Sequence, residues 1–350
     1  MADWMIYGAN GYTGELIARE AKSRGLTPVL AGRSASVKTL ADQLGLRSRI
    51  FALESGGLAK EIAGMKLVLH CAGPFSTTAR PMMEACLGAG AHYLDITGEI
   101  SVFELAACLD TEAEATGIVI IPGVGFDVVP TDCVAATLKA ALPTATSLAL
   151  GFDSRSGFSP GTAKTSVEGL GQGGKVRRDG AIVSVPLAWK TRHIDFGGGE
   201  KLAMTIPWGD VSTAWHSTGI PNVETYIPAS PKLVARLKRL NWVRPFLGLS
   251  PVQAIMKSRI AKSVRGPSEE TREKTPTFVW GEAANQRGER RIARLQTPNG
   301  YTLTVTASLG IVEHLLKKEV QPGFRTPSRL MGADYVTTLP GCGAIVVSKP

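Results

Sequence analysis

A glycine-rich motif near the start of the chain is the first pattern with chemical meaning. Gly8, Gly11 and Gly14 follow the short apolar segment 5–7 and lead into residues 15–24, whose apolar side chains have helical spacing. Glycine lets the backbone turn sharply and approach a phosphate, and the free N–H groups at a helix N-terminus attract negative charge. Because the motif lies between a predicted strand and a predicted helix, we expect it to bind the pyrophosphate of a dinucleotide rather than to form a turn alone.

Residue 33 indicates which dinucleotide is bound. A site for NAD places Asp or Glu at the end of the second strand, but this chain has Arg33 there. A guanidinium can bind the 2′-phosphate of NADP(H) through charge-assisted hydrogen bonds, so we predict NADP(H) against the alternative of a solvated surface arginine. The small residues 71–74 follow a later strand and should line the same crevice. The predicted cofactor-binding residues are Gly8, Asn10, Gly11, Tyr12, Thr13, Gly14, Arg33, Ser34, Cys71, Ala72, Gly73 and Pro74.

Polar side chains near the ends of two later strands are candidates for handling a substrate and a proton. The carboxyl ends of parallel strands meet at one edge of a sheet, where hydride transfer needs groups that orient the substrate and move a proton. Each candidate also has a structural alternative, such as a hydrogen bond from Asp95 to loop backbone or a helix cap formed by Glu99. The predicted site residues are Tyr93, Asp127 and Lys164 for catalysis and Thr97, Glu99 and Phe126 for substrate binding.

The elements that must position these residues change character along the chain. Up to about residue 150, strand-like and helix-like segments alternate, which predicts a parallel sheet with helices on both faces. Later stretches alternate apolar and polar residues between Gly-rich and Pro-rich turns, and 297–300 is typical of a hairpin. The fold class expected from this pattern is α/β, with a second domain built on a mostly antiparallel sheet.

Several motifs together resemble those of the saccharopine dehydrogenase-like reductases. The resemblance implies a Rossmann-type doubly wound domain over residues 1–135, an inserted α+β substrate domain over 136–320, and a C-terminal helix at 321–350 that returns to the Rossmann domain. One departure is His70, where we expect asparagine in relatives. The motifs are Tyr7–Gly14, Leu30–Arg33, Cys71–Phe75, His92–Glu99, Pro122–Asp132, Gly161–Ala163 and Gly323–Pro327.

Within that family the chain is most similar to the branch of trans-acting enoyl reductases, which implies a role in lipid metabolism. We therefore expect an NADPH-dependent oxidoreductase that reduces the conjugated C=C bond of an acyl or other apolar substrate. The alternatives are a saccharopine-type dehydrogenase that reduces the C=N bond formed from an amine and a keto acid, and a non-catalytic NADPH-binding scaffold. An amino-dicarboxylate substrate is the weaker alternative, because residues 151–174 contain only Arg155 and Lys164 as cations.

Composition excludes several other classes of protein. The 350 residues are 44% hydrophobic and 20% charged, so the chain can bury a core. No apolar run approaches the ~20 residues of a membrane-spanning helix, and the N-terminus lacks the basic region of a secretory signal. Five cysteines without a C-x-x-C pair predict reduced cytosolic thiols, no metal site and a cytoplasmic location, with Cys71 as a small buried residue rather than a nucleophile.

The net charge of +9 is concentrated in one segment. Residues 231–266 contain nine Lys and Arg and no Asp or Glu, with apolar residues at near-helical spacing. Such a segment can dock an acidic carrier protein that holds an acyl substrate, or an anionic lipid surface at the membrane periphery, or it can simply cover the second domain. The partners expected are therefore a free or carrier-tethered acyl substrate and a second copy in a homodimer, but no nucleic acid.

Overall fold

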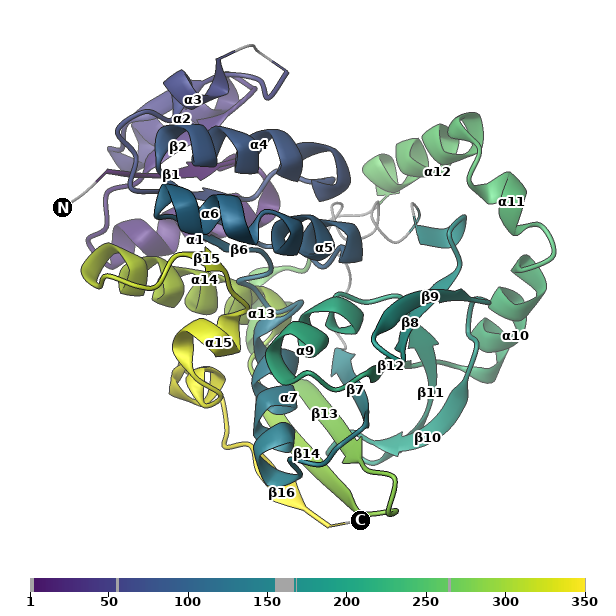
Figure 1. Ribbon diagram of the computed structural model, residues 1–350. Coiled ribbons are helices and arrows are strands. Elements are labelled where there is room, and N and C mark those ends of the chain that lie inside the picture. The colour runs from purple at the N-terminus through teal and green to yellow at the C-terminus, as the bar shows by residue number, and fades with distance from the viewer. Residues whose placement is uncertain (1–2, 55–56, 155–166, 168, 264–265, 350) are drawn as a thin grey trace. The chain divides into compact units, whose positions relative to one another are not determined.

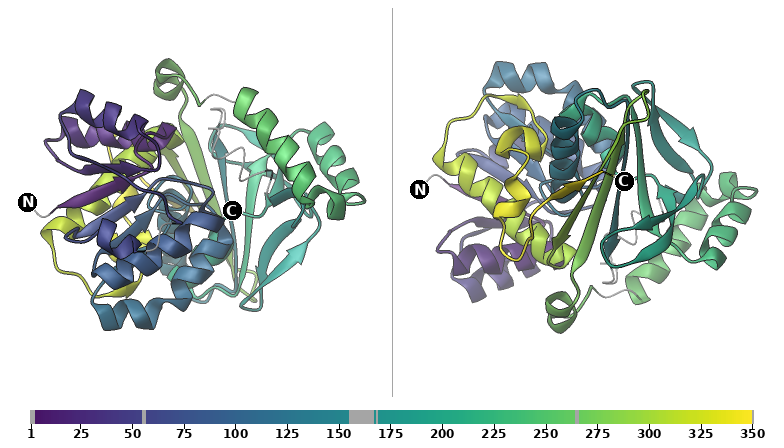
Figure 2. Two further views of the ribbon diagram at one scale, coloured as in Figure 1. Left: turned by 90° about the horizontal axis from the view of Figure 1, so that it is seen from above. Right: turned by 90° about the horizontal axis from the view of Figure 1, so that it is seen from below.

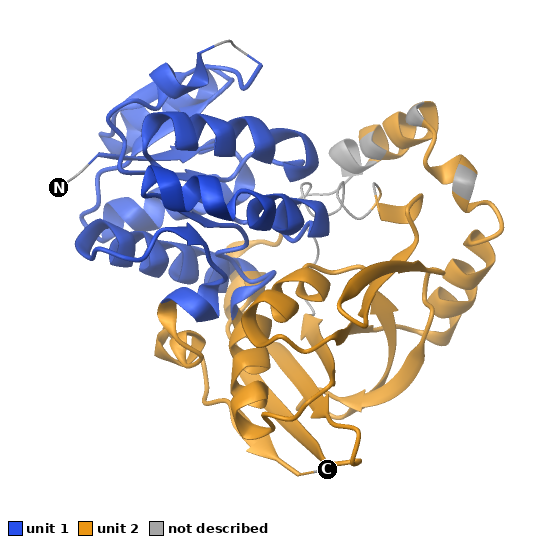
Figure 3. Ribbon diagram, in the orientation of Figure 1, with its two compact units in different colours: residues 1–129, 301–330 blue, residues 130–300, 331–350 orange. Residues whose placement is uncertain are grey.

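A computed structural model describes residues 3–54, 57–154, 167, 169–263 and 266–349. The chain forms two compact units, which Figure 3 shows in different colours. Unit 1 consists of residues 1–129 and 301–330, and unit 2 of residues 130–300 and 331–350.

Unit 1 is built on a parallel sheet (Figure 1). Its strands in the described residues are β1 (Trp4–Tyr7), β2 (Val29–Gly32), β3 (Ser48–Ile50), β4 (Leu67–His70), β5 (His92–Asp95), β6 (Val119–Ile121) and β15 (Gly323–Phe324). They lie in the order β15-β6-β5-β4-β1-β2-β3, and every pairing is parallel. The direction of winding reverses between β1 and β4, which is where open α/β sheets of this kind bind ligands. The predicted doubly wound α/β fold is confirmed.

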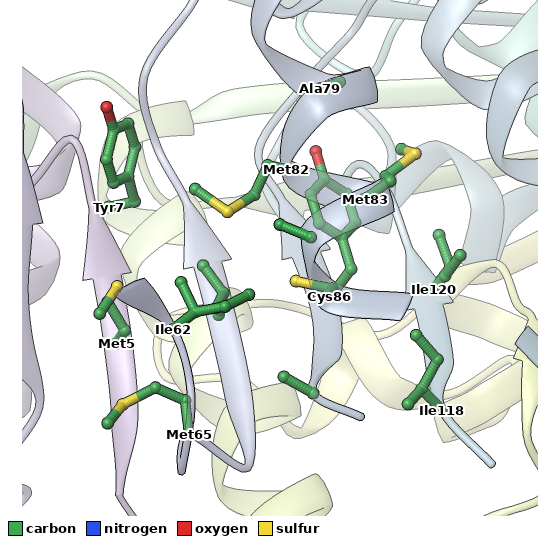
Figure 4. Close-up of a cluster of buried hydrophobic side chains, with 14 of the residues drawn as sticks. Met5, Tyr7, Ile62, Met65, Ala79, Met82, Met83, Cys86, Ile118 and Ile120 are labelled. Carbon is green, nitrogen blue, oxygen red and sulfur yellow. The ribbon is translucent and has the colours of Figure 1, made fainter. Parts of the chain in front are cut away.

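Helices cover both faces of this sheet. They are α1 (Tyr12–Ser23), α2 (Ser36–Leu44), α3 (Leu58–Glu61), α4 (Phe75–Ala89), α5 (Ile100–Cys108), α6 (Asp110–Thr116) and α14 (Gly300–Lys317), with α15 (Pro327–Met331) at the boundary with unit 2. On one face, Met82 and Cys86 of α4 pack against Met5 of β1 and Ile120 of β6 (Figure 4). The strands are apolar on both sides because neither face is left to water.

Unit 2 is built on a larger and mostly antiparallel sheet, as expected. The strands along its main path are β10 (Thr191–Asp195), β11 (Glu200–Ile206), β12 (Asn222–Pro228), β7 (Ser147–Ser154), β13 (Thr277–Ala284), β14 (Arg290–Thr297) and β16 (Val346–Ser348). The pair β8 (Gly174–Arg178) and β9 (Ala181–Val185) joins through β12, which pairs with β7 in parallel. Figure 2 shows from above and below how strongly this sheet curves. The hairpin predicted at 297–300 is instead the connection from β14 to α14.

Short helices flank the second sheet. They are α7 (Val129–Ala141), α9 (Asp210–Thr218), α10 (Pro231–Leu240), α11 (Arg244–Leu247), α12 (Ser250–Ser263), α13 (Glu269–Lys274) and the 3₁₀ helix η1 (Tyr335–Thr338). Helix α7 packs closely on β13 at Gly281, where a Cβ atom would lie 2.7 Å from side-chain carbons of both Val134 and Leu138. The sequence places glycine where helix and strand approach too closely for a side chain.

The boundaries of the units differ from those predicted. Residues 301–320 were expected in the second domain, but they belong to unit 1, where Arg24 pairs with Glu313 of α14 at 3.4 Å. Residues 321–350 were expected to return to unit 1; residues 321–330 do so, with β15 paired to β6, but residues 331–350 belong to unit 2, where β16 pairs with β14. Periodicity identifies a helix or a strand but not the sheet on which it packs. Among the described residues, no helix is both long enough and apolar enough to cross a membrane.

Gly281→Ala is expected to destabilise unit 2 by about 1–3 kcal/mol, because the added methyl group overpacks the contact with α7. Urea unfolding followed by circular dichroism measures this change. Gly343→Ala is the control, since its Cβ atom would meet only the carbonyl oxygen of Gln296 at 3.6 Å. Equal midpoints for the two variants would show that α7 can move away from β13 at no cost.

Candidate functional site

The turn from β1 to α1 has no room for side chains at two of its glycines. Gly8 has a φ of +81°, and a Cβ atom there would lie 2.8 Å from the backbone nitrogen of Ala72. A Cβ atom on Gly14 would lie 2.3 Å from the carbonyl oxygen of Gly8. The Gly8 N–H donates to the carbonyl of Ala31 at 2.7 Å, which ties the turn to the end of β2. The predicted glycine loop and the predicted 71–74 loop therefore adjoin.

The N-terminus of α1 opens from this turn. Gly11 is the N-cap residue, and no side chain caps the helix there among the described residues. The positive end of the helix dipole is thus left without a carboxylate partner at the cap, which suits a negatively charged ligand. The Asn10 amide donates to the Ser36 hydroxyl at 2.9 Å and joins the turn to the start of α2.

Arg33 lies directly after β2, as predicted. Its side chain is exposed and forms no ion pair with any residue in the described ranges. Lys38, one turn further on, differs because it pairs with Asp42 at 2.8 Å. The hydroxyl oxygens of Ser34 and Ser36 are 3.0 Å apart, within hydrogen-bonding distance. Arg33 is therefore the cation beside the glycine loop whose charge no described carboxylate neutralises.

His70, the last residue of β4, contacts the 71–74 loop through the side chain of Thr78. Its Nε2 atom lies 3.0 Å from the Thr78 hydroxyl, which itself donates to the carbonyl of Ala72 at 2.7 Å. A hydroxyl has a single proton, so the His70 Nε2–H must be the donor to Thr78. Burial lowers the pKa of His70 to about 3, and its Nδ1 atom has no hydrogen-bond partner in the described part of the chain. His70 is therefore a neutral histidine that positions the loop.

Asp95 is the buried carboxylate at the end of β5. It accepts hydrogen bonds from the Tyr93 hydroxyl at 2.7 Å, the Thr97 N–H at 2.9 Å and the Gly123 N–H at 2.8 Å. Burial raises its pKa to about 7, while these hydrogen bonds oppose that rise. Asp95 thus joins the loops after β5 and β6, which is the structural role considered for it from the sequence.

The structure argues against a catalytic role for Tyr93. Its ring is fully buried and its hydroxyl donates to Asp95. Burial raises its pKa well above 10.0, so it can neither reach a substrate nor release a proton near neutral pH. Sequence alone could not show this, because β5 residues can face either the crevice or the core.

The predicted substrate-binding residues also have structural partners. Both carboxylate oxygens of Glu99 accept N–H groups at the start of α4, from Phe75 at 2.9 Å and Ser76 at 2.7 Å. Thr97 is fully buried, and its hydroxyl accepts the Glu99 N–H at 3.0 Å. Phe126 is 8% exposed. Glu99 therefore caps a helix, and none of the three presents a free polar group for a substrate.

Asp127 keeps the properties expected of a catalytic group. It lies on the loop after β6 and is only partly buried, close to Gly98 after β5. Burial raises the pKa of its carboxyl to about 7, so that it can hold or release a proton near neutral pH. Perturbed carboxyl groups at the ends of parallel strands are typical of active sites.

Helix α14 contributes residues that sequence reasoning missed. The ring of Tyr301 packs edge-to-face on Tyr12 at 5.1 Å between ring centres. The Thr304 hydroxyl accepts the Phe126 N–H at 3.0 Å and so supports the loop that bears Asp127. A hairpin was expected at 297–300, so neither this helix nor its position in unit 1 was recognised from the sequence.

Three cations on the sheet of unit 2 are paired with carboxylates. Arg192 binds Glu282 through two hydrogen bonds of 3.0 and 3.1 Å, and Lys201 and Lys190 pair with Asp153 and Glu224. Lys164, predicted to be catalytic, and the motif 161–163 lie outside the described residues. The charges of Arg192, Lys201 and Lys190 are therefore neutralised by carboxylates within unit 2.

No metal site emerges from the described residues, and Cys71 is not a reactive thiol. They contain no cluster of three or more His, Cys, Asp or Glu side chains that could hold a metal ion. Burial raises the pKa of Cys71 far above its ordinary value, so the thiol is not a nucleophile. The interpretation of Cys71 as a small residue of the loop agrees with this environment.

The sequence is similar to known proteins mainly in unit 1. Residues 4–121 match the family described as the saccharopine dehydrogenase NADP binding domain. The chain is 33% identical over 149 residues to a probable mitochondrial saccharopine dehydrogenase-like oxidoreductase of Arabidopsis thaliana. It is 34% identical over 140 residues to a trans-acting enoyl reductase of Mycobacterium tuberculosis. Each alignment covers 37% of this chain and only 33% or 34% of the relative, about a third of its length.

Two solved structures are similar over the whole chain. Saccharopine dehydrogenase (L-Glu forming) of Saccharomyces cerevisiae superposes with a TM-score of 0.66 at 10% identity, covering 100% of both chains. Homospermidine synthase of Legionella pneumophila, solved with NAD, has a TM-score of 0.64 at 11% identity and covers 100% of this chain and 91% of its own. At such low identity, these similarities establish the fold and nothing finer.

His70→Gln is expected to remove an acid-sensitive part of the stability. The pKa of His70 is about 3 in the folded protein against an ordinary 6.5, so only the unfolded state takes up this proton between those values. The contribution is present above pH 6.5 and is lost as the pH falls, by about 1.4 kcal/mol per pH unit. Urea unfolding of both proteins at several pH values measures it. Between neutral pH and about pH 5, the wild type should lose about 2 kcal/mol more than the variant; parallel curves would contradict the assignment.

Proposed function

We propose that the chain, whose residues 4–121 match the saccharopine dehydrogenase NADP binding domain, is an NADPH-dependent reductase of the conjugated C=C bond of an acyl or other apolar substrate. The observation that carries the cofactor part is the tight glycine turn at Gly8 and Gly14, from which the N-terminus of α1 opens without a side-chain cap. Bound NADPH would supply the hydride. Residues of unit 1 would bind the cofactor, orient the substrate and transfer the proton.

The residues of unit 1 fit such a cofactor. The uncapped N-terminus of α1 and the glycine turn suit the pyrophosphate. Arg33, exposed and without a described carboxylate partner, suits a 2′-phosphate, whereas a site for NAD would have a carboxylate in its place. The 71–74 loop, which His70 and Thr78 hold against the glycine turn, would provide close backbone contact.

An apolar substrate is supported by the charges of unit 2. An amino-dicarboxylate would need cations free to bind its carboxylates, but Arg192, Lys190 and Lys201 are already paired with Glu or Asp. The similarity to a trans-acting enoyl reductase also favours reduction of a C=C bond. The fold shared with saccharopine dehydrogenase supports the C=N alternative only at the level of architecture.

Asp127 is the residue of unit 1 best suited to handle the proton. Its carboxyl, with a pKa raised to about 7 by burial, can be protonated near neutral pH and donate to the carbon next to the carbonyl or to a water molecule. Asp95 has a similar pKa, but its carboxyl is occupied by three donors in the core. We therefore assign Asp127 as the acid and Asp95 as the residue that positions the loops.

The proposed reaction is tested by following NADPH oxidation with three kinds of substrate. Enoyl thioesters of increasing chain length should be reduced, and imines formed from an amine and a keto acid should not. Turnover restricted to the amine and keto-acid mixture would favour a saccharopine-type activity. Tight NADPH binding without oxidation by any of these substrates would favour the non-catalytic scaffold.

Asp127→Asn is expected to lower kcat by about 100-fold, the lower end of the range typical for loss of a general acid. The wild-type rate should fall as the pH rises above about 7, because the protonated carboxyl is lost, and the variant should lack this limb. Asp132→Asn is the matched control, since an amide oxygen there can still accept the Ser217 hydroxyl. Equal pH profiles for the wild type and the Asp127 variant would remove Asp127 from the proton path.

Arg33→Glu should raise the KM for NADPH by about 10- to 100-fold and leave that for NADH little changed. The reason is that a charge-assisted contact with the 2′-phosphate is worth about 1.5–3 kcal/mol. Steady-state kinetics with both cofactors measure the change. Lys38→Gln is the control, because Asp42 already neutralises Lys38. An unchanged preference for NADPH in the Arg33 variant would refute this assignment.

A further inference from the structure

The segment from α10 to α12 has an unusual concentration of apolar side chains on its surface. Of the nine large hydrophobic side chains that are most exposed among the described residues, six lie between residues 233 and 255. Isolated apolar residues on a surface need no explanation, but a cluster of them marks a binding surface. These six, here called the apolar cluster, are Leu233 (41% exposed), Trp242 (89%), Val243 (45%), Phe246 (64%), Leu249 (51%) and Ile255 (56%).

The inner side of this segment is anchored to unit 2. Val234 and Leu237 of α10 pack with Ala188 and Met204, so part of the predicted apolar stripe does cover the second sheet. At the end of α10, the Asn241 side chain accepts the Leu187 N–H at 2.8 Å and donates to the Leu187 carbonyl at 3.2 Å. The covering role proposed from the sequence is therefore correct for the inner side only. The apolar cluster is a second surface, on residues that this packing does not use.

Positive charge accompanies the apolar cluster. Residues 231–266 contain nine Lys and Arg and no Asp or Glu. Lys232, Arg236, Lys238 and Arg239 of α10 are exposed, and none of them forms an ion pair with a residue whose position is described. Elsewhere on unit 2, cations such as Lys190, Arg192 and Lys201 are paired. The four cations of α10 are thus available to an external anion.

From this combination we propose that the α10–α12 segment binds the surface of an anionic phospholipid bilayer. Tryptophan and phenylalanine favour the boundary between headgroups and acyl chains, and Trp242 and Phe246 are the most exposed members of the apolar cluster. Unpaired Lys and Arg are attracted by anionic headgroups. An anionic bilayer surface satisfies both the charges and the aromatic rings, and binding of an acidic carrier protein instead is one outcome of the test below.

Binding to vesicles tests this proposal on the full chain. Vesicles of phosphatidylcholine with ~30 mol% phosphatidylserine should sediment the protein at about 0.1 M salt, and pure phosphatidylcholine vesicles should do so at least 10-fold less well. Trp242 fluorescence should shift to shorter wavelength on binding. Trp242→Phe should keep vesicle binding, because an apolar aromatic ring is retained. It should lose the fluorescence shift, because the indole that reports it is removed.

Two pairs of variants separate charge and apolar contact from general effects. Arg236→Gln/Lys238→Gln/Arg239→Gln should weaken binding at least 10-fold, while Arg287→Gln/Arg290→Gln/Arg291→Gln at the β13–β14 hairpin removes equal charge and should have little effect. Trp242→Ser/Phe246→Ser should also weaken binding at least 10-fold, whereas Val346→Ser/Val347→Ser, on other exposed apolar residues, should not. All these side chains are on the surface, and circular dichroism checks that each variant folds.

Three results would overturn the proposal. The first is that no vesicle sediments the protein, or that the control variants weaken binding as much as the test variants. The second is a dimer without lipid that Trp242→Ser/Phe246→Ser dissociates, which would assign the apolar cluster to a second copy of the chain. The third is binding of an acidic acyl carrier protein that the charge variant abolishes, without binding to vesicles, which would assign the segment to a protein partner.

Discussion

The close approach of two loops at the centre of the first sheet is the constraint on which the candidate site depends. The β1–α1 turn passes so near the loop after β4 that a side chain on Gly8 would meet the backbone of Ala72. The same turn leaves no space for a side chain on Gly14 against the carbonyl of Gly8. Backbone N–H groups and a helix N-terminus are thereby brought together at the point where the winding of the sheet reverses, which is where a phosphate can bind without interference from side chains.

Buried polar groups hold the loops around this turn in place. His70 is kept neutral by burial and holds the 71–74 loop through Thr78, and Asp95 joins the loops after β5 and β6. Glu99 accepts the first N–H groups of α4. A buried polar group is costly unless it is hydrogen-bonded, so these contacts favour one arrangement of the crevice loops. Asp127, on the loop after β6, is partly exposed, whereas Asp95 is fully buried.

Unit 2 distributes charge in two different ways. On its sheet, Arg192, Lys190 and Lys201 are paired with carboxylates, so these three cations are not free to bind an anionic substrate. On α10, four cations have no described carboxylate partner and lie in the same stretch of chain as exposed aromatic side chains. A reductase of apolar substrates that also binds an anionic bilayer would be brought to the phase in which such substrates dissolve. The two proposals rest on separate residues and are tested separately.

The sequence by itself determined the doubly wound sheet, the glycine turn and the position of Arg33, because periodicity and glycine spacing are local properties of the chain. It also indicated a second, mostly antiparallel domain and the basic segment. Only the tertiary structure decided that α14 and residues 331–350 lie in units opposite to those expected, since a periodic pattern does not specify the sheet that buries it.

The same distinction separates the candidate residues. Tyr93, Asp95, Thr97 and Glu99 looked equivalent to Asp127 in the sequence, because residue type and proximity to a strand end were the same kind of evidence for all of them. Burial distinguishes Tyr93, Asp95 and Thr97 from Asp127, and the hydrogen bonds of Asp95 and Glu99 involve segments distant in the chain, Gly123 for Asp95 and Phe75 for Glu99. A sequence can name the groups able to do chemistry, but only the fold shows how deeply each of them is buried.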